Sequence, residues 1–197
     1  MRVELSGVAK GRAALPPITL SYVSGELTLA EAETEERPTV LGLIASGRMR
    51  ADRGEVRIDG RTDAARIRRE VALVDAPTVS EPPPGVTLQG VVEEELMFAG
   101  RWPSRRSALD VLDGLGARDD ATTRMADLAP ATRIRVLSEL ALLRPGITGL
   151  VVVSPDRHGG EPTHWNADLT RIAERGIAVL AVIGRPAMAA LVPWSAE

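Results

Sequence analysis

The sequence predicts an α/β fold with a mainly parallel sheet, a small antiparallel β region at the N-terminus and a helical insertion. The continuous apolar runs 149–153 and 177–183 are typical of parallel strands that are buried on both faces. Apolar residues recur at helical spacing over 131–143, and buried strands that alternate with helices favour a parallel sheet. The early strands differ, because 2–5 alternates polar and apolar residues and 18–23 begins after a Pro-Pro pair, which suits a sheet edge.

The other elements follow from local periodicity and from turn residues. Residues 25–30 form a short apolar strand, 31–38 a polar loop, and 40–46 an apolar helix that stops at Gly47. Ser104 or Ser107 is able to cap the helix at 107–115. The remaining expected strands are 55–59 and 70–74, and the remaining helices are 64–69, 86–98, 167–174 and 186–191. We expect a single domain over 1–197, with an antiparallel part at about 1–30 and 54–75 and a helical insertion at about 78–143.

Composition narrows the classes of function. There are no cysteines among the 197 residues, which removes disulfides, thiolate metal sites and a cysteine nucleophile. The formal charge of -3 argues against nucleic acid as a partner, because phosphate contacts need clustered cations. No apolar run approaches the roughly 18 residues of a membrane span, and residues 1–12 lack the apolar core of a signal peptide. We therefore expect a cytoplasmic protein.

The segment 25–60 has the order strand, loop, helix, strand and turn, which is the frame of a phosphate-binding loop. Gly-Glu pairs at 25–26 and 54–55 begin the two strands, and Asp59-Gly60 marks the turn. This frame resembles the nucleotide-binding domain of ABC transporters, whose phosphate loop has the pattern G-x-x-G-x-G-K-[ST]. In the same register the three glycines are replaced by Ala32, Glu35 and Arg37, the lysine is replaced by Pro38, and only Thr39, at the magnesium-ligand position, matches.

These replacements change the chemistry of the loop. Glycines let backbone N–H groups curl around an anion, and proline has no N–H. Four carboxylates also surround the expected phosphate position, and two unit charges about 4 Å apart interact by ~4 kcal/mol at an effective dielectric of about 20. They are Glu31, Glu33, Glu35 and Glu36. We interpret the segment as an acidic loop, with Arg37, Pro38 and Thr39 as degenerate nucleotide-binding (Walker A) positions.

The same resemblance continues along the chain. The hydrophobic positions of the family pattern are kept, and the polar residues of its motifs are replaced. Ala76 stands at the position of the family's glutamine, and Gly184 at that of its switch histidine. Residues 128–136 resemble the signature L-S-G-G-Q-x-x-R-V in outline only. Ser154 and Pro155 occupy the positions of the metal-holding aspartate and the catalytic glutamate of the second acidic (Walker B) motif.

The resemblance implies an ABC-type subunit that is deficient in ATP hydrolysis. It would act as a structural or regulatory partner of another ABC ATPase subunit or of a transmembrane transporter subunit, or pair with a second copy of itself. Its docking surface would lie at about 76–106, and it would be peripheral on the inner face of the membrane through that partner. We assign no catalytic residue and no metal site and expect no cofactor, since the lost residues argue against ATP and Mg²⁺. The alternatives are a divergent but active ABC-type ATPase and a stand-alone scaffold or ligand-binding protein.

The two histidines allow other chemistry. His158 and His164 lie near Asp156 and Glu161, which could suggest a metal site, and Ser154 with His158 could suggest a nucleophile and its base. Neither spacing is diagnostic, and we interpret His158 as a solvated loop residue. The three tryptophans, Trp102, Trp165 and Trp194, are candidates for core packing or for partner contacts.

Overall fold

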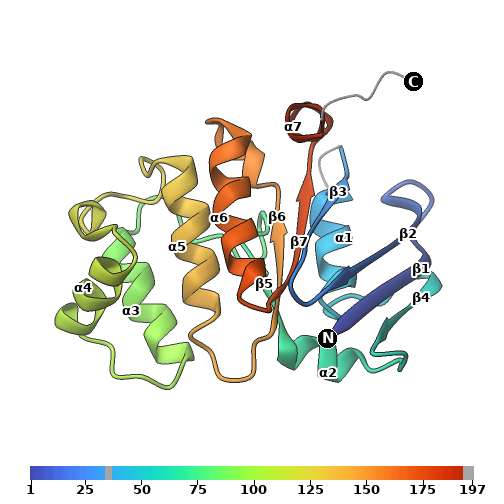
Figure 1. Ribbon diagram of the computed structural model, residues 1–197, viewed down its shortest axis with the longest axis horizontal. Helices are drawn as coiled ribbons and strands as arrows, with labels where there is room; N and C mark the ends of the chain where they lie inside the picture. The colour runs from blue at the N-terminus through green and yellow to red at the C-terminus, as the bar shows by residue number, and fades with distance from the viewer. Residues whose placement is uncertain (34–36, 193–197) are drawn as a thin grey trace.

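The computed structural model describes residues 1–33 and 37–192. Its N-terminal part contains an antiparallel sheet of three strands in the order β2-β1-β4 (Figure 1). These strands are β1 (Arg2–Lys10), β2 (Leu15–Val23) and β4 (Arg53–Ile58). The alternation in β1 buries Val3 and Leu5 completely, so one face of this sheet is apolar and packs on the rest of the molecule.

A second sheet is entirely parallel, with the strand order β3-β7-β6-β5. It contains β3 (Leu27–Glu31), β5 (Val71–Val74), β6 (Gly149–Val153) and β7 (Ala178–Ile183), and every residue of the last three strands is buried. The mainly parallel α/β fold is thereby confirmed. The assignment of 25–30 and 70–74 to the antiparallel part was wrong, because β3 pairs with β7 and β5 pairs with β6, both in parallel.

Helix α1 (Arg37–Ala45) lies between the two sheets (Figure 1). Leu41 and Ile44 are fully buried there with residues of β1 on one side and of β6 and β7 on the other. A Cβ atom at Gly42 would lie 2.5 Å from Cγ2 of Val153, so glycine allows the close approach of helix and strand. Helix α2 (Ala64–Glu70) follows β4 and is capped by Asp63, which accepts a hydrogen bond from the N–H of Arg66 at 2.8 Å.

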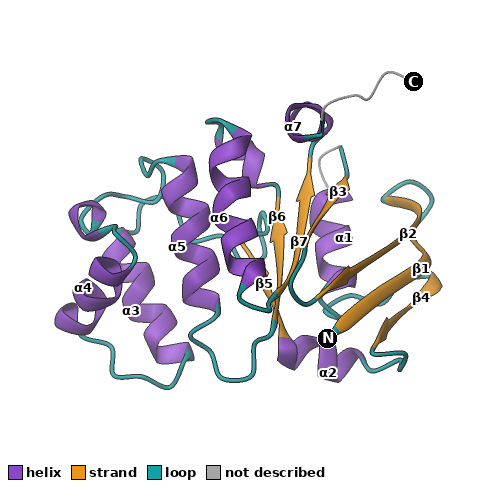
Figure 2. Cartoon of the chain, viewed as in Figure 1, coloured by secondary structure: helices purple, strands orange, loops and turns teal. Residues whose placement is uncertain are grey.

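The remaining helices build a layer on the other face of the parallel sheet and extend beyond it (Figure 2). They are α3 (Leu88–Phe98), α4 (Arg105–Gly114), α5 (Pro130–Ala141), α6 (Pro162–Glu174) and α7 (Arg185–Leu191). Ser104 caps α4 by accepting from the N–H of Ser107 at 3.1 Å. Helix α6 begins five residues earlier than expected, because Pro162 fits the first helical position. We call residues 86–143 the helical arm.

Within residues 1–33 and 37–192, none of the helices combines the length and the apolar character that a membrane crossing requires.

Candidate functional site

The carboxyl ends of the four parallel strands meet at one edge of the sheet, which is where open α/β sheets bind ligands (Figure 2). Helix α1 begins at this edge after β3, and α7 begins there after β7. Asp75 directly follows β5, and Ser154 directly follows β6. The structure therefore places residues 37–39 and 154–155, which the sequence resemblance aligned with Walker positions, at the same edge of the sheet and on different elements.

The acidic loop after β3 is partly described. The backbone N–H of Arg185 donates to Oε1 of Glu33 at 2.8 Å, and its Nε donates to Oε1 of Glu31 at 3.2 Å. These two carboxylates are thus tied to the first residue of α7 rather than left free. Glu35 and Glu36, which complete the expected acidic cluster, lie outside the described residues.

Residues 37–39, which the resemblance aligned with the Walker A motif, form the first turn of α1. The Nε atom of Arg37 donates to the carbonyl of Ala13 at 3.3 Å, which directs this side chain toward the β1–β2 turn. Pro38 has no N–H to offer an anion. Thr39 is half-buried in the same turn.

The turn after β6 has an unusual backbone. Ser154 adopts a left-handed conformation with φ 49°, and its N–H donates to the carbonyl of Val182 at 2.8 Å. Pro155 is buried and opens a short 3₁₀ turn, Pro155–His158. Asp156 accepts a hydrogen bond from the N–H of Gly184 through Oδ2 at 3.1 Å, while its Oδ1 is buried without a partner.

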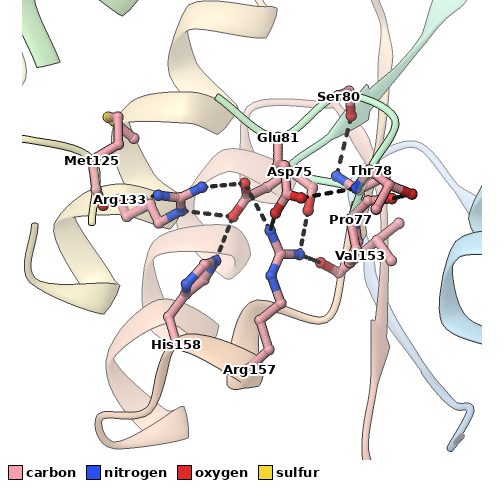
Figure 3. Close-up of polar contacts among 11 residues, drawn as sticks. Asp75, Pro77, Thr78, Ser80, Glu81, Met125, Arg133, Val153, Arg157 and His158 are labelled. Carbon is pink, nitrogen blue, oxygen red and sulfur yellow. Dashed lines mark hydrogen bonds and ion pairs between the residues drawn. The ribbon is translucent and has the colours of Figure 1, made fainter. Parts of the chain in front are cut away.

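The strongest polar feature of the edge is an ion cluster around Asp75 (Figure 3). The Arg133 guanidinium contacts both carboxylate oxygens of Asp75, with Nη2 at 2.7 Å from Oδ1 and Nε at 2.9 Å from Oδ2. Nε2 of His158 lies 2.9 Å from Oδ2, and Nη2 of Arg157 lies 3.2 Å from Oδ1. A carboxylate has about four lone-pair sites, and this one has four such contacts.

Secondary contacts extend the cluster. Nη2 of Arg157 also lies 2.9 Å from Oε2 of Glu81, and its Nη1 donates to the carbonyl oxygens of Asp75 and Val153. Nη1 of Arg133 donates to the carbonyl of Met125 at 2.9 Å. The cluster therefore joins the end of β5, the turn after β6 and helix α5 of the arm (Figure 3).

Burial sets the energetics of this cluster. The side chain of Asp75 is 0% exposed and that of Arg133 is 5% exposed. Burial alone, the largest single influence, would raise the pKa of Asp75. Hydrogen bonds from Arg133 and His158, with the charges of Arg157 and Arg133, outweigh burial and hold the pKa of Asp75 below its ordinary value. Asp75 is thus an ionised carboxylate that is fully occupied within the chain.

Sequence reasoning missed this cluster. It treated His158 as a solvated loop residue, and that interpretation was wrong, because His158 is three-quarters buried and bonded to Asp75. The available signal was weak: a charged residue directly after a buried strand, and an arginine among the apolar positions of α5. No group of three or more histidine, aspartate or glutamate side chains with metal-site geometry occurs in the described part of the chain.

A cavity of about 440 Å³ adjoins the cluster between the Pro82–Pro84 segment and the residues that precede α5. Arg133 and His158 line the cavity, together with the acidic residues Glu81 and Asp127. Both the Arg133 and the His158 side chains already bond to Asp75, so the negative charge of Asp75 offsets part of the positive charge of Arg133 at the cavity.

Comparison with solved structures defines the class of fold. The dimeric structure of MJ0796, a bacterial ABC transporter cassette, matches with a TM-score of 0.68 and 20% identity over 96% of this chain and 90% of that one. A dimeric post-hydrolysis state of the same cassette, bound to ADP and Pi, matches with a TM-score of 0.67 and 21% identity over 95% of this chain and 90% of that one. A putative ABC transporter ATP-binding protein from Pyrococcus furiosus matches with a TM-score of 0.66 and 14% identity over 94% and 92% of the two chains. The chain therefore has the fold of an ABC transporter ATP-binding cassette domain.

Sequence comparison points the same way. The chain is 30% identical over 144 residues to the ribose import ATP-binding protein RbsA 1 of Rubrobacter xylanophilus. This match covers 66% of the chain but only 28% of the relative, so the chain spans less than a third of that protein. No protein-family model matches the chain.

These comparisons contradict the expectation that no cofactor is used. The similar proteins include one named as an ATP-binding protein and a cassette that holds ADP and Pi. The expectation rested on individual side chains, namely the missing glycines and lysine. It gave too little weight to the retained backbone frame, in which the N-terminus of α1 follows a strand at the ligand-binding edge.

Proposed function

We propose that this protein is an ABC-type ATP-binding subunit that is deficient in ATP hydrolysis and serves as a structural or regulatory partner. The turn after β6 carries the proposal. The resemblance places a metal-holding aspartate and a catalytic glutamate there, and this chain has Ser154 and Pro155 instead. Neither side chain has a carboxylate to accept a proton from water or to neutralise a cation.

The other carboxylates near this edge support the proposal because they are already engaged. Asp75 has four contacts with cationic or histidine nitrogens, and Glu81 pairs with Arg157. Glu31 and Glu33 bond to Arg185. Asp156 differs from these four, since one of its buried oxygens has no partner, and it is the carboxylate to test as a substitute base.

The decisive experiment is phosphate release by the purified protein at millimolar Mg-ATP, with nucleotide binding measured on the same sample. We expect a turnover below about 0.01 s⁻¹, whereas typical enzymes turn over at roughly 1–10³ s⁻¹. Thr39→Ala and Asp156→Asn should leave this residual rate unchanged. A measurable rate that falls at least tenfold in either variant would show a divergent, active ATPase and would overturn the proposal.

The partner role is supported by a groove between the sheet and the helical arm. This groove has a volume of about 210 Å³, and its lining includes Val79, which is 49% exposed. Arg48 and Arg144 also line it. The pKa of Arg48 is lowered by partial burial and by repulsion from Arg144 and Arg68. Asp75 and Glu95 line the groove as well, and Glu95 pairs with Arg144, so Arg48 is the lining cation without an ion pair in the described chain. We propose this groove, with its exposed Val79 and its Arg48, as the docking place of an ABC-type partner.

A photo-crosslinking residue at Val79 tests the partner role, with the same residue at exposed Arg12 as the matched control. We expect crosslinks from position 79 to a transmembrane transporter subunit, an ABC-type ATPase or a second copy of the chain, and none from position 12. The similar cassette MJ0796 is dimeric, which favours a cassette as one such partner. Equal crosslinking from both positions would contradict this docking place.

A further inference from the structure

The end of the helical arm carries three protruding apolar side chains within six residues of sequence. Met97 and Phe98 are each 62% exposed at the C-terminal end of α3, and Trp102 is 82% exposed in the loop before α4. The other large hydrophobic residues that are exposed in the described chain, Val79 and Val192, stand apart in sequence. We call residues 97–106 the arm tip; Figure 1 shows it along the lower edge of the arm, between α3 and α4.

The arm tip is also cationic. Arg101, Arg105 and Arg106 are exposed, and none of them takes part in an ion pair with another residue of the described ranges 1–33 and 37–192. Exposed acids occur on the same helices, at Glu94, Asp110 and Asp113, but they form no ion pair with these arginines in the described chain. The tip therefore combines three exposed arginines that form no ion pair in the described chain with exposed aromatic surface.

One contact orders this surface. The guanidinium carbon of Arg144 lies 5.4 Å from the centroid of the Phe98 ring, and the same guanidinium forms a bidentate pair with Glu95. Phe98 is thereby held at the surface with a cation over its ring, and it remains 62% exposed.

We propose that the arm tip binds the surface of a lipid bilayer that contains anionic lipids. Protruding aromatic residues suit the interfacial zone of a bilayer, where tryptophan lies at the level of the headgroups. Arginine stems cover apolar surface while their guanidinium groups reach lipid phosphates. A protein partner would instead engage aromatic anchors by enclosing them in a packed pocket, and an exposed tip with three unpaired cations is better matched by a fluid anionic surface. The proposal does not depend on the proposed deficiency in hydrolysis.

The expected strength of membrane partitioning follows from the number of arginines at the tip. One arginine near an anionic membrane contributes about fivefold to partitioning, so the three together contribute roughly a hundredfold. The attraction weakens as salt rises, because the Debye length falls from about 10 Å at 0.1 M to about 3 Å at 1 M. Insertion of Trp102 adds an apolar contribution of about tenfold that salt does not remove.

The test is sedimentation of the full chain with vesicles of phosphatidylcholine alone or with about 30% phosphatidylserine, a composition that gives a negative surface potential. We expect salt-sensitive binding to the anionic vesicles only. Replacement of the three tip arginines by glutamine should lower partitioning about a hundredfold, and Trp102→Ser about tenfold. The matched controls are Arg53→Gln, Arg61→Gln and Arg69→Gln together, which make the same change in net charge on exposed residues elsewhere, and Val192→Ser. These controls should stay within about threefold of the wild type, since they lie outside the tip.

Tryptophan fluorescence gives an independent readout, because Trp102 is exposed while Trp165 is 1% exposed. We expect a blue shift with anionic vesicles that is lost in Trp102→Ser. Three results would overturn the proposal: no sedimentation with anionic vesicles at low salt, equal losses in tip and control variants, or binding of a polyglutamate peptide to the tip without vesicle binding. The last result would assign the tip to an acidic protein partner.

Discussion

Neutralising Asp75 tests how much the ion cluster, which lies where the carboxyl ends of the parallel strands meet, contributes to stability. Asp75→Asn keeps the shape of the side chain but leaves Arg133, which is 5% exposed, without its carboxylate. Breaking a buried ion pair by removing one partner costs about 3–5 kcal/mol, because the remaining charge stays buried and unpaired. With a urea dependence of about 2 kcal/mol/M, the midpoint of unfolding should fall by roughly 2 M.

Urea unfolding followed by circular dichroism measures this shift, and two further variants identify its origin. Asp75→Asn combined with Arg133→Met removes the stranded charge and should recover at least half of the loss. Asp52→Asn breaks the Lys10–Asp52 pair, whose side chains are 32% and 53% exposed, and should leave the midpoint close to that of the wild type. If Asp75→Asn alone stayed within about 0.5 M of the wild type, the reasoning from burial would be refuted.

Three further predictions concern buried residues of the cluster, of helix α1 and of strand β2. The pKa of Asp75 is held below its ordinary value in the folded state, so its stabilisation is complete above the unfolded pKa of about 4 and is lost as the pH falls through the folded pKa. The stability difference between wild type and Asp75→Asn should therefore shrink below about pH 4 in acid titrations of urea midpoints, and a constant difference down to pH 2 would contradict this. Gly42→Ala should destabilise by about 1–2 kcal/mol despite the better helix propensity of alanine, because its Cβ would lie 2.5 Å from Val153; calorimetry measures the change, and a raised Tm would disprove the clash. Tyr22→Phe should cost about 1–3 kcal/mol, because Tyr22 Oη donates to the buried carbonyl of Ala45 at 2.8 Å; an unchanged urea midpoint would show that this carbonyl finds another donor.

Local signals in the sequence predicted much of the fold. The strands at 149–153 and 177–183 were identified because a continuous apolar run is itself the signature of burial on both faces. Ser104 was one of two candidate caps, with Ser107, because capping acts over three residues, and the structure selects Ser104. The sheet membership of 25–30 and 70–74 could not be read in the same way, because it depends on partners more than 70 residues away in the chain.

The ion cluster escaped prediction for a related reason. Asp75 and Arg133 are separated by 58 positions, and Asp75 and His158 by 83. A single sequence shows that charged residues occur but not which of them share a buried space. Ser154 and Pro155 were placed correctly at the end of β6, whereas their consequences for hydrolysis remain part of the proposal.

The cluster also bears on how nucleotide would act on this chain. Asp75 has its four sites filled by Arg133, Arg157 and His158, so helix α5 is held against the ends of β5 and β6 by groups of the chain itself. The first turn of α1 follows β3, which lies at the opposite end of the sheet order from β5. A ligand shifts an equilibrium only by its differential affinity for two states. Helix α1 packs on β6 and β5 through Gly42, so a nucleotide at α1 would move α5 only if it changed these four contacts.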